Sequence, residues 1–117
     1  RKWLVRNLDQ IISKFIRFRD RRCVTCGTTE DLTCGHVFSR VAYSTRWDEE
    51  NAFAQCLREN FCHEHDPYPY PLWYQNKFGK EKLDELHRRY KTIRKISNGE
   101  LADMLEHYKA IVSVSYQ

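Results

Sequence analysis

The sequence predicts a single α+β domain in which a small, cysteine-rich centre of two strands and a helix lies between helical segments. Three observations support this class. The 117 residues suit one compact domain, apolar residues recur with helical spacing towards both ends, and short β-branched runs occur in the middle. We divide the domain into a basic N-terminal helix (1–22), the cysteine-rich centre (23–66) and a C-terminal helical part (67–117).

The N-terminal element is predicted to be an amphipathic helix over residues 3–19. Its apolar side chains recur three or four residues apart, which places them on one helical face. They are Leu4, Leu8, Ile11, Phe15 and Phe18. The helix ends in a basic run at residues 17–22, and residues 88–95 form a second basic run. Both runs are candidate phosphate contacts, and a solvated helix face is the alternative for each.

The centre is predicted to contain a knuckle, a β-hairpin and a short helix. A C-x-x-C-G turn lies at residues 23–27. The β-branched and aromatic residues that follow favour strands. In chain order we expect a strand at 32–38, a long irregular loop at 39–50, a return strand at 51–55 with Cys56 at its end, and a short helix at 60–65.

The C-terminal part is predicted to be helical after an irregular start. Residues 66–71 read DPYPYP, and three prolines in five positions argue against regular structure there. Helices are expected at 72–78 and at 81–90. Ser97 and Glu100 form the S-x-x-E pattern of a capping box, which opens a last helix. The inward face of that helix is predicted to comprise Leu101, Met104, Leu105, Tyr108 and Val112.

Composition and charge narrow the class of protein. Twenty basic and 16 acidic residues give a net charge of +4, which permits nucleic-acid binding without requiring it. Mean hydropathy is −0.76, and no apolar run approaches the roughly 20 residues of a membrane span. Five cysteines, an odd number, argue against a disulfide framework. Thiolates on a metal in a reducing compartment are the better interpretation, so we expect a cytoplasmic location.

The thiols predict a structural zinc site. Cys23 and Cys26 have the spacing that lets two sulfurs face one ion, and Cys56 follows at a reasonable return distance across a hairpin. Redox chemistry is the rival, but the βαβ context that it needs is missing. Softness favours Cys62 as the fourth ligand, with a free buried thiol as the alternative. The other candidates for that position are Glu59, His63, His65 and Cys34.

His36 is a candidate general base, because it ends a short strand beside the knuckle. A merely packed or solvated histidine is the alternative. The ordered set of C-x-x-C-G, Gly-His, Asn and Cys resembles the HNH, or His-Me finger, endonucleases, and is most similar to the phage NinG/Rap-like recombination nucleases. The similar segments are 23–27, 34–40, 45–48, 51–56, Asn60 and 66–70.

The resemblance implies a β-hairpin and a helix around a catalytic divalent ion, Mg²⁺ or Mn²⁺, with the zinc separate and structural. It also implies residue roles. His36 would deprotonate the attacking water, Asn51 would hold the hairpin loop and orient His36, and Asn60 would bind the catalytic ion.

Two further residues are candidates on physical grounds. Glu64 lies four residues after Asn60 on the same helical face, so we expect it to be a second ligand of the ion. His63 is its rival, and an exposed helix residue is the alternative. Arg40 is expected to bind the scissile phosphate with both guanidinium arms, and a generic backbone contact is the alternative.

The chain departs from the family pattern at two positions. Gly35 stands where many HNH enzymes carry an aspartate that binds the metal, although NinG-like members resemble this chain there. Glu59 stands where the fourth zinc cysteine is usual. These departures leave the shell of the catalytic ion and the fourth zinc ligand open.

The sequence therefore predicts a metal-dependent DNA endonuclease, with branched or single-strand-containing DNA as the expected substrate and a homodimer as a candidate state. One alternative is a non-catalytic, zinc-stabilised nucleic-acid-binding module. Another is a protein-interaction domain that uses the aromatic loop 66–71. The aromatic residues near the presumed site are candidates for stacking on bases, and core packing is the stronger interpretation for most of them. They are Trp47, Tyr68, Tyr70, Trp73 and Tyr74.

Overall fold

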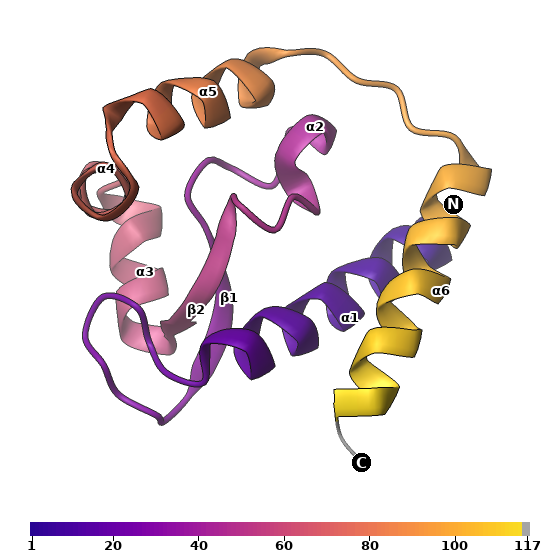
Figure 1. Ribbon diagram of the computed structural model, residues 1–117, viewed down its shortest axis with the longest axis horizontal. Coiled ribbons are helices and arrows are strands. Elements are labelled where there is room, and N and C mark those ends of the chain that lie inside the picture. The colour runs from indigo at the N-terminus through magenta and orange to yellow at the C-terminus, as the bar shows by residue number, and fades with distance from the viewer. Residues whose placement is uncertain (116–117) are drawn as a thin grey trace.

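Two antiparallel strands lie at the centre of the fold, and helices pack against both faces of this hairpin (Figure 1). The computed structural model describes residues 1–115. Within them the element order is α1 (Lys2–Asp20), β1 (Leu32–His36), α2 (Tyr43–Arg46), β2 (Ala52–Cys56), α3 (Leu57–His65), α4 (Pro69–Phe78), α5 (Lys80–Lys91) and α6 (Asn98–Ser115). The predicted α+β class is confirmed.

The N-terminal helix is confirmed and lies beside α6, although the two are far apart in sequence (Figure 1). Leu8, Ile12 and Ile16 are its buried residues. The helix ends at Arg21, whose φ of 65° is left-handed and whose N–H donates to the Arg17 carbonyl at 2.8 Å. This ending turns the chain into the cysteine knuckle.

The hairpin separates two apolar cores. Its register pairs Leu32 with Cys56 and His36 with Ala52. Every residue of β2 is buried, and successive side chains point to opposite faces. Ala52 therefore joins the core of α1 and α6, whereas Phe53 joins the core of α4 and α5.

The outer edge of β2 is occupied by groups from the end of α1 and the knuckle. The Ala54 N–H donates to Asp20 Oδ2 at 2.8 Å, and the Ala54 carbonyl accepts the Val24 N–H at 2.9 Å. Arg19 Nη2 donates to the Ala52 carbonyl at 2.8 Å. The helix end and the knuckle thus take the place of a third strand.

The predicted hairpin differs from the structure at its ends. The first strand stops at His36 rather than at residue 38, because both backbone groups of Phe38 bond to the Asn51 side chain. The predicted irregular loop contains the short helix α2. The helix after the second strand begins directly at Leu57, so Cys56 is its N-cap.

The prediction that residues 66–71 exclude regular structure is wrong, because α4 begins at Pro69. Pro69 and Pro71 fall in its first turn, where backbone N–H groups have no helical acceptor in any case. Proline's fixed φ also suits this position. The prolines therefore start the helix instead of preventing it.

The predicted capping box is confirmed. The Glu100 N–H donates to Ser97 Oγ at 3.1 Å, and the Ser97 N–H donates to Glu100 Oε2 at 3.0 Å. The predicted inward face of α6 is buried or partly buried. Within residues 1–115, no helix has the length and apolar character needed to span a membrane.

Candidate metal centre and active site

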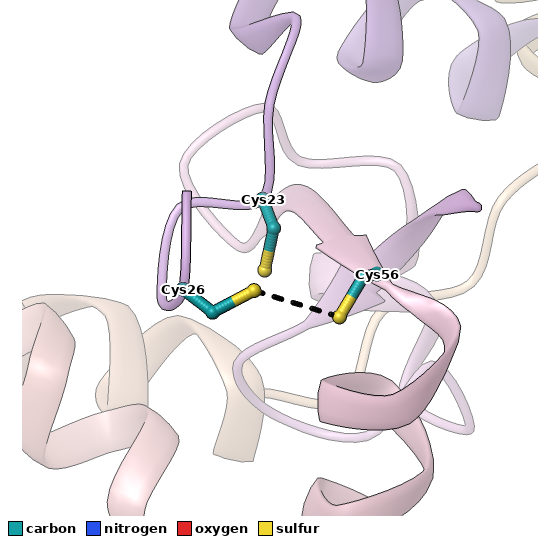
Figure 2. A group of neighbouring side chains, drawn as sticks. All are labelled: Cys23, Cys26 and Cys56. Carbon is teal, nitrogen blue, oxygen red and sulfur yellow. Dashed lines mark hydrogen bonds between the residues drawn. The ribbon is translucent and has the colours of Figure 1, made fainter. Parts of the chain in front are cut away.

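Three of the four predicted zinc ligands are brought together at one end of the hairpin. The sulfurs of Cys23, Cys26 and Cys56 all lie within 4.8 Å of one another, and those of Cys26 and Cys56 are 3.7 Å apart. Figure 2 shows the three side chains converging from the knuckle and from the end of β2. Gly27 takes a φ of 83°, and its N–H donates to the Cys23 carbonyl at 2.8 Å, which closes the knuckle.

The electrostatics of the cluster suit a metal cation. Burial raises the pKa of Cys23, but hydrogen bonds from the Thr25 hydroxyl and from backbone amides outweigh it and lower the value to about 6. A backbone hydrogen bond from Thr28 lowers the pKa of Cys26, but the neighbouring sulfurs and desolvation together outweigh it, so the pKa of Cys26 is raised. A cation would stabilise all three thiolates together, so the donor set fits zinc.

The fourth predicted ligand is not among these sulfurs. Cys62 is exposed on α3, and its sulfur lies outside the group. Glu59 lies 3.7 Å from the Arg58 guanidinium. Cys34 lies on β1, where burial raises its pKa to about 12. Within residues 1–115, no further cysteine, histidine or carboxylate joins the three-sulfur group.

A cavity of about 970 Å³ brings together the predicted catalytic residues other than Asn51. His36 enters it from the end of β1, and Arg40 enters from the loop that follows. Asn60, His63 and Glu64 enter it from α3. Residues from the hairpin and from the helix that follows it therefore line one cavity.

His36 is held in a defined orientation. Its Nε2 lies 2.9 Å from the Arg46 carbonyl, which can only accept, so we assign the proton to Nε2 and the lone pair to Nδ1. Burial lowers the pKa of His36, and the positive charge of Arg40 acts in the same direction, against the hydrogen bond to Arg46. His36 is consequently neutral at neutral pH, as a general base must be.

Asn51 closes the loop around this histidine. It is fully buried, its Oδ1 accepts the Phe38 N–H at 2.9 Å, and its Nδ2 donates to the carbonyls of Phe38 and Thr45, each at 3.0 Å. Thr45 precedes Arg46, whose carbonyl bonds to His36. Asn51 thus ties the two ends of the hairpin loop together.

Asn60 presents an oxygen for a hard cation. Its Nδ2 donates to Thr33 Oγ1 at 3.0 Å, which leaves Oδ1 as the free atom of the amide. Glu64 lies one helical turn later, is exposed, and lines the same cavity. Both groups offer the oxygen ligands that Mg²⁺ prefers.

The glycine before His36 has a packing explanation. A Cβ added to Gly35 would lie 2.2 Å from Gln55 Oε1, so an aspartate cannot occupy this position without displacing Gln55. The Tyr70 hydroxyl also donates to the Gly35 carbonyl at 2.7 Å. An aspartate at this position would therefore require the Gln55 side chain to move.

Asp9 is a site residue that the sequence did not reveal. Its Oδ1 accepts from Arg46 Nε at 3.0 Å and from Trp47 Nε1 at 2.8 Å, and its Oδ2 accepts from Arg46 Nη2 at 2.6 Å. The same stretch of backbone holds His36. Asp9 is a half-buried residue of α1. Only the tertiary structure brings it to the hairpin loop, which is far away in sequence.

Replacing Asp9 with alanine should destabilise the protein by about 1.5–3 kcal/mol, because the Arg46 guanidinium would lose its charged partner. Urea unfolding measures this loss. The matched control is Asp84→Ala, which removes an exposed partner of Lys80 at 2.9 Å and should leave the stability almost unchanged. Equal losses in the two variants would contradict a positioning role for Asp9.

Two arginines of the predicted phosphate-binding runs make ion pairs and hydrogen bonds to other residues of the protein. Arg19 pairs with Asp20 at 2.8 Å and donates to the backbone of β2. Arg89 pairs with Asp48 at 3.0 Å and with Glu85 at 3.1 Å. These two arginines therefore brace the hairpin and its loop.

Most of the aromatic residues near the candidate site are buried or partly buried, as expected for residues that pack in a core. Trp47, Tyr70 and Tyr74 are buried in the two cores, which confirms packing as their role. Tyr68 is 71% exposed and lines the large cavity. Trp73 is half-buried against Phe53.

Comparison with known proteins gives the family. A family model described as Bacteriophage Lambda NinG protein matches residues 1–115. The chain belongs to the NinG family. Within this family it is similar to Protein ninG of Escherichia phage 933W, with 31% identity over 80% of this chain and 49% of that protein. Protein ninG of Enterobacteria phage H19B is 30% identical over 89% and 59%, and that of Escherichia phage lambda is 29% identical over 80% and 48%.

This NinG-family chain spans about half the length of the curated relatives that it matches. No solved structure matches it. The function proposed below therefore rests on the arrangement of the side chains in this structure.

Proposed function

We propose that this NinG-family chain is a metal-dependent DNA endonuclease of the HNH type, stabilised by one structural zinc and acting on branched DNA in phage recombination. One observation carries the proposal. His36, with a free Nδ1 and a lowered pKa, shares a cavity with Arg40, Asn60 and Glu64. A base, a cationic arm and two oxygen ligands are the groups that phosphodiester hydrolysis needs.

In this proposal His36 Nδ1 accepts a proton from the attacking water. The Arg46 carbonyl fixes the ring through Nε2, and Asn51 fixes the loop that carries this carbonyl. Arg40 binds the scissile phosphate through its guanidinium. A divalent ion held by Asn60 and Glu64 would supply charge stabilisation at the phosphate and the departing oxygen.

The zinc would be held by Cys23, Cys26 and Cys56, with Cys62 proposed as the fourth ligand. These residues would join the knuckle to the junction of β2 and α3. Asn60 lies on the first turns of the same helix, so the cysteine cluster and the cavity share one support. Zinc bound there would therefore stabilise the position of α3.

A non-catalytic, zinc-stabilised DNA-binding module is the second candidate. The observation that favours it is Gly35, which stands where many HNH enzymes carry a metal-binding aspartate and which packs against the Gln55 side chain. DNA binding that persists without any cleavage would support this candidate.

Replacing Asn60 with alanine tests the proposed ion ligand. The variant should lose about 10²-fold or more in cleavage of junction DNA with Mg²⁺ or Mn²⁺, because an ion that stabilises charge in the transition state contributes several kcal/mol. Thr33→Val is the matched control, because it removes the same Asn60–Thr33 hydrogen bond and leaves Asn60 Oδ1 in place. Equal activity of the two variants would exclude Asn60 as a ligand.

The pH profile of cleavage should have its acid limb below 6.5. Burial lowers the pKa of His36, so the active, neutral base persists at a pH where an ordinary histidine is half protonated. Activity is then lost only as the pH falls through the lowered pKa. Arg40→Gln should move the midpoint upward, because the Arg40 charge contributes to the lowering. A midpoint at or above 6.5 in the native protein would contradict this assignment.

A further inference from the structure

A second cavity of about 310 Å³ adjoins the candidate active site. It lies where the end of β2 meets α3 and α4, and its walls include Gln55, His63, Tyr70 and Trp73. His63 lines this cavity and the large one, so the two are neighbours. The volume is at the lower end of the range for small-molecule sites.

The cavity contains a polar atom that the fold does not satisfy. Gln55 is only 2% exposed, and within residues 1–115 its buried Oε1 has no hydrogen-bond partner. His63 also lines this cavity, and its ring is partly buried. Buried polar atoms without partners are costly and rare in folded proteins, and a leucine would fill the same space without that cost. The Gln55 oxygen is therefore available to a ligand.

The chemistry of the walls selects the ligand. A glutamine amide offers a donor and an acceptor side by side, which matches the edge of a nucleobase. Tyr70 and Trp73 offer aromatic surface to the flat faces of a base. Glu59 and Asp66 also line the cavity, and their negative charge opposes entry of a phosphate but not of a neutral base.

A metal ion is a poorer occupant of this cavity. Within the described residues, the side chains around it do not bring three metal-ligand atoms of cysteine, histidine or carboxylate within 4.8 Å of one another. The unpartnered Gln55 oxygen is also a weak ligand for a soft cation. The observations favour a planar, hydrogen-bonding and uncharged group.

We propose that this cavity binds one unpaired nucleobase of the DNA substrate, with Gln55 hydrogen-bonding to its edge. The proposal rests on DNA as the ligand in the proposed function and adds the feature that is recognised. An unpaired base costs less to remove from the helical stack than a paired one. The site would therefore direct the neighbouring active site to DNA in which pairing is interrupted.

The test compares binding of two duplexes that differ by one unpaired adenine, with no added Mg²⁺ or Mn²⁺ so that binding is measured without cleavage. The native protein should bind the interrupted duplex roughly tenfold more tightly, as expected for one base that stacks on aromatic side chains. Gln55→Leu should remove most of this preference and leave binding to the paired duplex unchanged. Gln10→Leu, on an exposed position of α1, is the matched control and should keep the preference.

The stability of the variant and the fluorescence of the unpaired base provide two readouts that do not depend on the binding comparison. Gln55→Leu should be at least as stable as the native protein in urea, because it removes a buried polar group without a partner. The fluorescence of 2-aminopurine at the unpaired position should change on binding to the native protein, since this base would enter an aromatic cavity. That measurement uses the native chain and so holds even if the variant folds poorly.

The outcomes separate this inference from the proposed function. Equal binding of the two duplexes by the native protein, or an undiminished preference in folded Gln55→Leu, would overturn the base pocket and leave only water in the cavity. Cleavage with Mg²⁺ would in that case still support the endonuclease. A preference lost in Gln55→Leu, with no cleavage of junction DNA by the native protein in Mg²⁺ or Mn²⁺, would support the pocket and contradict the endonuclease.

Discussion

Replacing His36 with alanine should reduce DNA cleavage by about 10²–10⁴-fold, the usual contribution of a general base. The neutral ring, its free Nδ1 and its fixed Nε2 are the features that would be lost. The expected cost in stability is only about 1 kcal/mol, because the variant loses one hydrogen bond to the Arg46 carbonyl. Single-turnover cleavage of junction DNA, together with urea unfolding, measures both effects.

The matched control is His107→Ala. His107 is an exposed residue of α6 and lines neither of the two cavities described above. Its replacement should leave cleavage unchanged. DNA binding by His36→Ala should equal that of the native protein, since the neutral ring makes no charged contact with phosphate. Cleavage by His36→Ala at the native rate would reject the base, and the non-catalytic module would be the better interpretation if neither protein cleaves.

Replacing Cys56 with serine should produce the largest loss of stability. Structural zinc contributes roughly 10–16 kcal/mol in zinc-finger peptides, where no other core supports the fold. This chain has two apolar cores, so we expect a loss of several kcal/mol rather than complete unfolding. Elemental analysis should show that zinc is lost from the variant, and a zinc chelator should lower the unfolding midpoint of the native protein to a similar value.

Cys62→Ser addresses the fourth ligand in the same experiment. If Cys62 binds the ion, its replacement should reduce zinc content and stability, although its sulfur lies outside the three-sulfur group. Unchanged zinc stoichiometry and stability would remove Cys62 from the site. Full zinc content in Cys56→Ser would instead show that the cysteine cluster is not the zinc site.

The fold was predictable where the information is local. Apolar spacing located α1 and α6, and the capping box located the start of α6 through contacts three residues apart. The prolines of 66–71 misled the prediction, because proline breaks a helix in its interior but fits its first turn. The strand end at His36 was not predictable, because it depends on a side chain that returns from Asn51.

The candidate site divides in the same way. The ordered motif predicted His36 and Asn60, and helical spacing added Glu64; in the structure all three line one cavity. Asp9 and Gln55 carry no local signal. The contacts of Asp9 span α1 and the hairpin loop, and the importance of Gln55 lies in a partner that the fold does not supply. Such residues can be identified only when the tertiary contacts of each side chain are known.

The groups at the outer edge of β2 have a consequence for self-association. An exposed strand edge is a template for another chain, and proteins commonly protect it against aggregation. Here the side chains of Arg19 and Asp20 and the backbone of Val24 already occupy the edge groups of Ala52 and Ala54. Intermolecular sheet extension at this strand is therefore blocked, and a homodimer that engages a branched DNA would have to associate through a surface other than the edge of β2.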